Sequence, residues 1–173
     1  MNVLFENSFT RDVEWSRDIY RYIYFRRPIA IAMHSIYAFG FILGLISTIL
    51  IGELNFFIIA APLLYLIILL IYLSNSRILP RRDIEMHGKP IENKIIVTDE
   101  CIRSSASTGA ELQLRYADVR RIVRTKKFVY LLTRTKVFYS FKVSGFTLGD
   151  ADGLVAFLKE KVRQEKELRG ANK

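Results

Sequence analysis

The stretch IAIAMHSIYAFGFILGLISTILI, from Ile29 to Ile51, contains no Asp, Glu, Lys or Arg. After the polar step GELN at 52–55, a second uncharged run, FFIIAAPLLYLIILLIYL, extends from Phe56 to Leu73. As helices, at ~1.5 Å per residue, these runs would be roughly 34 and 27 Å long, close to the ~30 Å hydrocarbon core of a bilayer. A helix of this length in a soluble protein needs a polar stripe, and neither run has one. The sequence therefore predicts two transmembrane helices, 29–51 and 56–73, in preference to a buried hairpin of a soluble protein.

Basic residues flank this hairpin on both of its outer sides. Arginines precede it at Arg11, Arg17, Arg21, Arg26 and Arg27 and follow it at Arg77, Arg81 and Arg82, whereas the step between the runs carries only Glu53. Because Lys and Arg are retained on the cytoplasmic side, we expect a multi-pass protein of the cytoplasmic membrane with both termini in the cytoplasm. The first run is much longer than the apolar part of a signal peptide, and a second run follows at once, which disfavours a cleaved leader.

The N-terminal segment, residues 1–28, is predicted to hold a short strand at 2–9 and then a helix. Thr10 is the expected N-cap, with Asp12 and Glu14 in the first turn of the helix. The segment RDVEWSRDIYRYIYFRRP mixes aromatic residues with arginines just before the first span, a composition typical of the headgroup region. The alternative is an amphipathic helix that packs on the later domain.

Residues 77–173 are predicted to form one cytoplasmic domain. They carry 21 Lys and Arg against 12 Asp and Glu, a difference equal to the whole net charge of +9. A basic link at 77–82 is followed by short strand-like pieces bounded by turn residues. The predicted strands are 84–87, 94–97, 101–106, 111–114, 119–126, 128–133 and 136–143.

An amphipathic helix is predicted from Asp150 to about Leu168. Leu154, Leu158 and Val162 recur at four-residue steps, while Lys159 and Arg163 take the other side. About seven antiparallel strands followed by one C-terminal helix is the element order of a pleckstrin-homology-like (PH-like) barrel. The predicted fold class is therefore a membrane helical hairpin plus an α+β cytoplasmic domain, with a plain α+β sandwich as the alternative to the barrel.

Three segments of the chain together resemble a known family. The opening FENSFTRDVEW…YIYFRRP, the two-helix hairpin, and TDECIRSS…LRYADVRRIVRTKKFVYLL are similar to the YcxB-like small bacterial membrane proteins. The resemblance implies a PH-like domain in the cytoplasm beneath two spans. It brings no catalytic residues.

Residues for catalysis or metal binding are sparse. Cys101, His34 and His87 do not form a plausible Cys–His dyad, because His34 lies in a span and no orienting group is evident. Two distant histidines do not supply a metal site, and the sequence has no Gly-rich phosphate loop. A lone cysteine excludes an internal disulfide. We therefore expect no enzyme, no metal and no cofactor, and we interpret His34 as an ordinary residue near the cytoplasmic end of its span in preference to a proton relay.

Two features are candidates for binding. Gly40 and Gly44 form a GxxxG pattern that lets helices approach closely, with Ala60 or Ala61 of the second span as the expected partner and a second copy of the protein as the alternative. The other feature is a basic stretch that comprises Arg120, Arg121, Arg124, Lys126 and Lys127. The neighbouring Phe128 and Tyr130 share a face with Leu132 and are expected in the core, so nucleic acid is an improbable partner. Anionic lipid headgroups, another membrane protein or simple solvation of the stretch are the interpretations that remain.

These features together predict an integral membrane protein with a cytoplasmic, non-catalytic binding or adaptor domain of unknown ligand. The alternative is an accessory subunit of a membrane transport or secretion complex, in which the Gly40 and Gly44 face mediates assembly.

Overall fold

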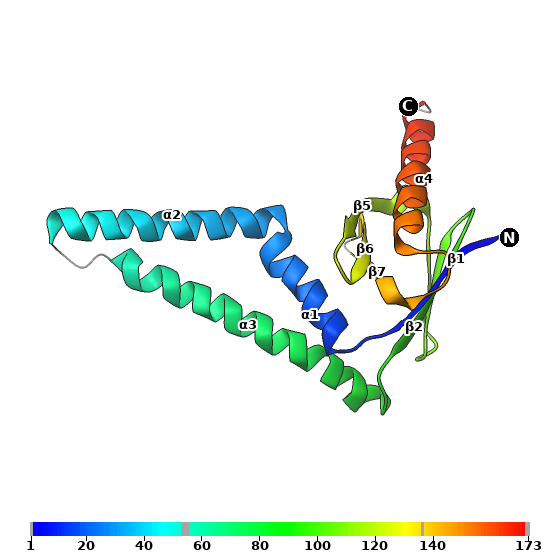
Figure 1. Ribbon diagram of the computed structural model, residues 1–173, viewed down its shortest axis with the longest axis horizontal. Helices are drawn as coiled ribbons and strands as arrows, with labels where there is room; N and C mark the ends of the chain where they lie inside the picture. Colours follow the sequence, from blue (N-terminus) through cyan, green and yellow to red (C-terminus); the bar gives the residue numbers. More distant parts are fainter. Residues whose placement is uncertain (1, 53–55, 136, 172–173) are drawn as a thin grey trace. The chain divides into compact units, whose positions relative to one another are not determined.

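The computed structural model describes residues 2–52, 56–135 and 137–171 (Figure 1). These residues form two compact units: a helical unit, Asp12–Arg82, and a sheet domain made of Met1–Arg11 together with Asp83–Lys173. The sheet domain is therefore discontinuous in sequence, with the whole helical unit inserted between its first strand and its remainder. Residues 53–55 of the predicted polar step, and Lys136 at the start of the predicted strand 136–143, lie outside the described residues.

The helical unit begins with α1 (Val13–Arg21), which is capped by Asp12 and not by Thr10. The Asp12 carboxylate accepts a hydrogen bond of 2.7 Å from the backbone N–H of Trp15, while Thr10 is still part of a strand. The predicted cap was wrong by two residues because both side chains suit the position and Thr10 is needed for strand pairing. A π-helical turn, η1 (Tyr22–Arg26), continues α1.

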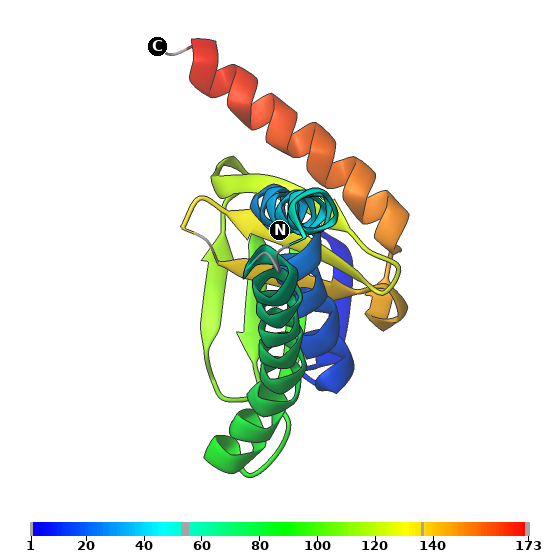
Figure 2. The same ribbon diagram turned by 90° about the vertical axis from the view of Figure 1, so that its left-hand side faces the viewer.

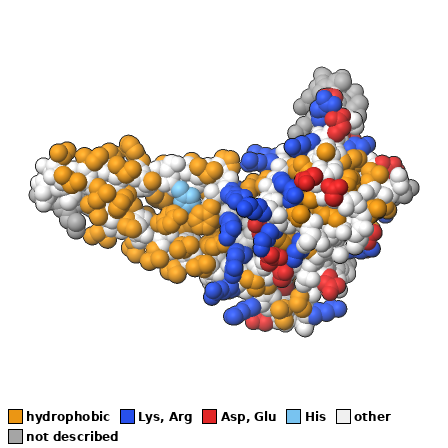
Figure 3. Space-filling model, viewed as in Figure 1, with side chains coloured by type: hydrophobic (Ala, Val, Ile, Leu, Met, Phe, Trp, Pro, Cys, Tyr) orange, Lys and Arg blue, Asp and Glu red, His pale blue; other side chains and the backbone are white. Residues whose placement is uncertain are grey.

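Two long helices follow, α2 (Pro28–Ile51) and α3 (Phe56–His87). Arg27 is extended and Pro28 occupies the first turn of α2, where a missing N–H costs nothing. Both helices are long and apolar enough to cross a membrane, and only 11% of the most apolar stretch of each is buried. Ile49 and Leu50 of α2 are 80% and 79% exposed. Hydrophobic side chains gather on the visible face of the two helices (Figure 3).

The second helix continues well past the predicted span. Residues 74–82, predicted as a span end and a basic link, and residues 84–87, predicted as the first strand, are all helical. The helix runs through Pro80 and ends where Gly88, at φ +71°, donates its backbone N–H to the carbonyl of Ile84. A glycine in the left-handed conformation followed two residues later by Pro90 is a helix-stop pattern, and it decides this segment over the weak strand alternation.

The sheet domain contains two antiparallel sheets. The larger has five strands in the order β4-β3-β2-β1-β8. The smaller has three in the order β5-β6-β7. The strands are β1 (Val3–Thr10), β2 (Glu92–Thr98), β3 (Ile102–Ala106), β4 (Glu111–Leu114), β5 (Val119–Arg124), β6 (Phe128–Thr133), β7 (Phe138–Lys142) and β8 (Phe146–Leu148).

The N-terminal strand β1 lies inside the larger sheet, between β2 and β8. It pairs on one side with β2, from Val3 opposite Thr98 to Thr10 opposite Glu92, and on the other side with β8. It also reaches the smaller sheet, because the fully buried Asn7 bonds the backbone of Lys142 in β7. The Asn7 amide donates to the Lys142 carbonyl at 2.8 Å and accepts from its N–H at 3.0 Å.

The C-terminal helix α4 (Ala151–Ala171) passes beside β5 and the short helix η2 (Tyr116–Asp118), as Figure 2 shows. Asp150 caps α4, since its carboxylate accepts the backbone N–H groups of Asp152 and Gly153. The predicted apolar stripe is confirmed: Leu154 and Leu158 are fully buried and Val162 nearly so. This stripe continues into a core that includes Phe128 and Tyr130, which are also fully buried, as predicted.

The structure confirms the coarser part of the predicted fold class, two long apolar helices followed by a sheet-rich domain with a C-terminal helix. The count of about seven strands was wrong. Among the described residues the domain has eight strands in sheets of five and three. Residues 84–87 belong to α3. The predicted N-terminal strand is confirmed as β1, but it lies inside the larger sheet between β2 and β8, and β8 forms an edge of that sheet; the local pattern revealed neither placement.

Candidate functional site

The basic stretch predicted as a binding surface lies on β5 and the turn that connects it to β6. The pairing of β5 with β6 shifts register between Val119 and Arg121, so an irregularity falls at Arg120. A residue inserted in this way interrupts the strict alternation of side chains between the two faces. Arg120 and Arg121 are both exposed, and both line the same groove.

That groove lies between β5 and α4 and has a volume of about 340 Å³. Its lining combines buried or half-buried apolar residues with cationic ones: Val119, Arg120, Arg121 and Ile122 from β5, and Lys159, Val162 and Arg163 from α4. We call this site the β5–α4 groove. The sequence pattern placed Lys159 and Arg163 on the solvent side of α4 and did not identify them as site residues. Their four-residue spacing indicated only that they lie on the same side of the helix.

The cations of the β5–α4 groove differ in how far they are neutralised. Arg163 donates to Glu160 at 2.9 Å and lies 4.0 Å from Glu167. The hydrogen bond from Arg163, together with one from Gln164, lowers the pKa of Glu160. Among the described residues, the side chains of Arg120, Arg121 and Lys159 form no hydrogen bond or ion pair.

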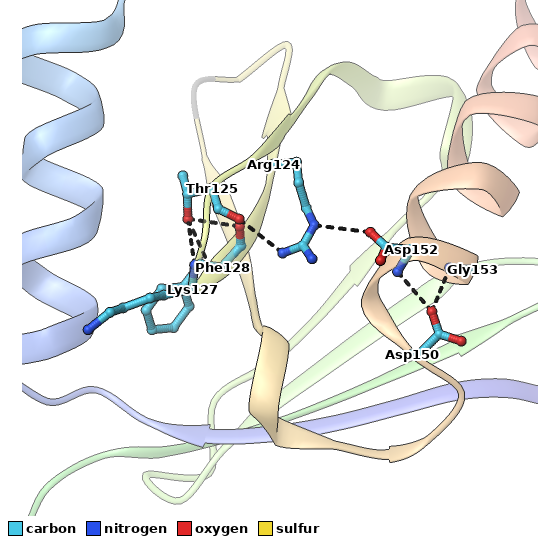
Figure 4. A network of polar contacts seen from close by, with 7 residues as sticks. All are labelled: Arg124, Thr125, Lys127, Phe128, Asp150, Asp152 and Gly153. Atoms are coloured by element: carbon cyan, nitrogen blue, oxygen red, sulfur yellow. Dashed lines mark hydrogen bonds and ion pairs between the residues drawn. The ribbon is translucent and has the colours of Figure 1, made fainter.

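The remaining members of the basic stretch are not part of this groove. Arg124 turns toward the start of α4, where its guanidinium lies 3.4 Å from the Asp152 carboxylate and donates to the carbonyl of Thr125 at 2.9 Å. Lys127 extends in the opposite direction from Arg124 (Figure 4). Lys126 is exposed in the turn. Two residues of the basic stretch, Arg120 and Arg121, therefore line the groove, and the other three do not.

In the helical unit, Gly44 lies against α3. A Cβ at this position would come within 3.1 Å of Phe57 and 3.4 Å of Ile58, so the absent side chain permits the close approach. Gly40 has more room, with its nearest such neighbour, Phe57, at 3.7 Å. The nearest atoms are therefore those of Phe57 and Ile58 and not of Ala60 or Ala61, the predicted partners.

A pocket of about 550 Å³ opens between α2 and α3, lined mainly by apolar and aromatic residues, among them His34 and Tyr65. The Nε2 of His34 donates to the carbonyl of Tyr24 at 2.9 Å, since a carbonyl can only accept. The imidazole stacks on Phe25 and meets Tyr65 edge-on. These contacts tie α2 to the π-helical turn, which is a structural role for the histidine.

No catalytic role was predicted for Cys101 or His87, which both belong to the sheet domain. Cys101 is buried in the sheet domain, and its backbone carbonyl accepts from the Thr98 hydroxyl at 3.0 Å. The Tyr116 hydroxyl donates to the carbonyl of Thr98, and burial, with the nearby Cys101 and Asp99, raises the pKa of Tyr116. His87 is exposed at the end of α3. Across residues 2–52, 56–135 and 137–171, no three His, Cys, Asp or Glu residues gather as a metal site would require.

One protein-family model matches a part of the sheet domain. Residues 94–158 match the family model described as YcxB-like protein, which confirms the predicted resemblance for this part of the chain. The matched segment begins within β2 and ends in α4, and it includes the β5 wall of the β5–α4 groove together with Asp152. No curated protein and no solved structure matches the chain.

Proposed function

We propose, from the premise that residues 94–158 are a YcxB-like domain, that this protein is a two-span membrane protein with a non-catalytic binding domain in the cytoplasm. The ligand we propose is the headgroup layer of anionic lipids, which basic residues of β5 contact. The sheet domain would then act as an adaptor that binds the membrane surface and is tethered there by α2 and α3.

One observation carries the topological part of the proposal: β1 and β2 are neighbours in one sheet although all of α1, α2 and the spanning part of α3 lie between them. Seven residue pairs join these strands. Strands on opposite sides of a bilayer cannot pair, so a hairpin that crosses the membrane must return to the side from which it started. This pairing supports a hairpin that crosses the membrane twice.

Charge supports the cytoplasmic side for the sheet domain. Arginines precede α2 and follow the apolar part of α3 in the sequence, at the two ends of the hairpin from which the chain continues into the sheet domain, and Lys and Arg near spans are retained in the cytoplasm. Arg17, Arg21 and Arg26, and on the other helix Arg77 and Arg81, are exposed, as residues in a headgroup layer would be. The low burial of α2 and α3 supports the same proposal, because a soluble hairpin would cover most of its apolar surface.

A PH-like domain is our interpretation of the sheets and α4. In its favour are two antiparallel sheets linked through Asn7, the order of β2 to β7, and a final helix whose Leu154 and Leu158 fill the core. We prefer binding over catalysis because the β5–α4 groove is lined by cationic and apolar side chains, which suit an anionic ligand. The alternative of a subunit assembled through Gly40 and Gly44 is less favoured, since Gly44 already packs on α3 of its own chain.

The lipid part of the proposal is tested with the full-length protein in vesicles. We expect backbone amides of β5 to exchange hydrogen more slowly in vesicles that contain phosphatidylglycerol than in vesicles of phosphatidylcholine alone. The difference should shrink as salt is raised, because attraction to a charged surface is screened beyond about 8 Å at physiological ionic strength. Equal exchange in the two vesicle types at low salt would contradict the proposal.

A further inference from the structure

We infer that the β5–α4 groove is a discrete binding site for the anionic headgroup of a single phospholipid. The inference rests on the proposed function and makes it specific. It names one site on the sheet domain, adds Lys159 and Arg163 of α4 to the site, and leaves out Arg124, Lys126 and Lys127 of the basic stretch.

The charge in the groove is the first argument. Four cationic side chains, Arg120, Arg121, Lys159 and Arg163, line a space of about 340 Å³. Only Arg163 has carboxylates within ion-pairing distance among the described residues, and those carboxylates belong to its own helix. Like charges gathered in this way repel one another, and an anion placed between them removes the repulsion. Two adjacent arginines also offer paired N–H donors that fit the oxygens of a phosphate.

The second argument is the composition of the groove's base. Val119 and Val162 are 1% and 7% exposed, and Ile122 is half-buried. Buried apolar side chains beside the cations lower the local dielectric, which strengthens an ion pair formed there. A phospholipid headgroup matches this lining, because its phosphate can pair with the cations and the carbon atoms of its glycerol can contact the apolar side chains. The volume is at the lower end of the ~300–1,000 Å³ that small-ligand pockets occupy, so it suits a headgroup and not a whole lipid.

Arg124 illustrates why the groove and not the whole basic stretch is the site. Its guanidinium is held by Asp152 and by the Thr125 carbonyl (Figure 4). Arg124 is not among the residues that line the groove, whereas Arg120 and Arg121 of the same strand are. The Asp152 contact also lies at the first turn of α4, whereas Lys159 and Arg163 are two and three turns further along.

A lipid is preferred over a soluble anion because the sheet domain is covalently continuous with two apolar helices through α3. Under the proposed topology, this tether keeps the groove at a high effective concentration of headgroups, so a modest affinity suffices for occupancy.

The test uses the full-length protein in a neutral detergent, with short-chain dioctanoyl phosphatidylglycerol as the probe and native mass spectrometry as the readout of bound lipid. The groove variant changes Arg120, Arg121 and Lys159 to Ser. Its matched control changes Lys89, Lys126 and Arg134 to Ser, which removes the same charge from exposed positions outside the groove. We expect at least tenfold weaker binding by the groove variant and less than a threefold change in the control.

A second measurement locates the lipid in the unmodified protein. Phenylglyoxal modifies accessible arginines, and we expect dioctanoyl phosphatidylglycerol to slow the modification of Arg120 and Arg121 but not that of the exposed Arg134. Dioctanoyl phosphatidylcholine, which carries no net charge, should give no protection.

Three outcomes would overturn the inference: an equal loss of binding in both variants, equal protection of all three arginines, or protection by inorganic phosphate at the concentration at which the lipid protects. The last would assign the groove to a soluble anion. Because this test is made in detergent, it does not depend on topology. If β5 is protected in anionic vesicles while the groove variant binds the lipid normally, the proposed function stands and the groove assignment fails.

Discussion

Asn7 is the residue on which the joining of the two sheets depends most directly. Its side-chain amide satisfies both backbone groups of Lys142, in the manner of an additional strand, and it is completely buried. Period-two alternation places Asn7 on the face of β1 that carries Phe5 and Phe9, but no local pattern predicts which groups its amide will bond. The partner is 135 residues away, and only the fold brings it near.

We predict that Asn7→Ala lowers the free energy of unfolding of the sheet domain by about 2–4 kcal/mol, because it leaves a buried donor and a buried acceptor unpaired. The matched control is Ser8→Ala at the adjacent exposed position, with an expected change within about 0.5 kcal/mol. Pulse proteolysis of the full-length protein in urea would measure both. Similar losses in the two variants would show that the bridge contributes nothing particular.

The ionisation of Tyr116 should lower the stability of the sheet domain at alkaline pH. Its pKa in the folded protein is raised above 10.0, first by burial and then by Cys101 and Asp99. Between the unfolded and the folded pKa, the unfolded chain has lost the proton and the folded chain retains it, so stability falls as pH rises above about 10.

Tyr116→Phe should therefore cost about 1 kcal/mol at pH 8, from the lost hydrogen bond to Thr98, and should reduce the fall in stability between pH 9 and 11. Some fall should persist, since burial raises the pKa of Tyr139 as well. Urea unfolding across this range measures the slopes for both proteins. Parallel slopes would contradict the assignment to Tyr116.

At the scale of elements, two kinds of local signal predicted well. The apolar stripe on α4 follows from helical periodicity, and the positions of β3, β4 and β6 follow from the turn residues that bound them. The α3 segment 84–87 was misassigned because four residues fit either a strand or a helix, and the Gly88 and Pro90 signal that decides between them was read as a turn after a strand. The continuation of α3 through Pro80 has no local signal, since a proline more often ends a helix than lies within one.

For α4 we predict that Leu158→Asp unfolds the sheet domain or lowers its stability by several kcal/mol, because the carboxylate would lie in a fully buried, apolar site. The matched control is Ala156→Asp, two residues earlier on an exposed face of the same helix. In Ala156→Asp the lower helix propensity of Asp costs little, at most ~0.7 kcal/mol. Thermal unfolding of both full-length variants in detergent gives the comparison. An unchanged melting temperature for Leu158→Asp would show that α4 does not pack through this residue.

At the scale of the whole molecule, the sequence was sufficient for the two apolar helices and for the family, but not for the membership of β1 in the sheet domain. Residues 3–10 alternate only loosely, and their partners in β2 follow 82 to 95 residues later. A fragment that begins at Arg82 would lack the strand that lies between β2 and β8, so tests of binding require the full chain.

The candidate site shows the same division between local and non-local information. The sequence identified Arg120 and Arg121 but grouped them with their neighbours along the chain. Lys159 and Arg163 come to them from α4 through tertiary packing, which the pattern of neither segment encodes.

The central claim, that the hairpin crosses a membrane and returns to a cytoplasmic sheet domain, is tested most directly by thiol labelling in intact cells. Cys101, the only native thiol, is first changed to Ala, and single cysteines are then introduced by Asn55→Cys between the helices and Thr108→Cys in the exposed β3–β4 turn. We predict that an impermeant maleimide labels the Asn55→Cys protein from outside, and labels the Thr108→Cys protein only after the membrane is opened. Labelling of the Thr108→Cys protein in intact cells, with no labelling of the Asn55→Cys protein, would contradict the account.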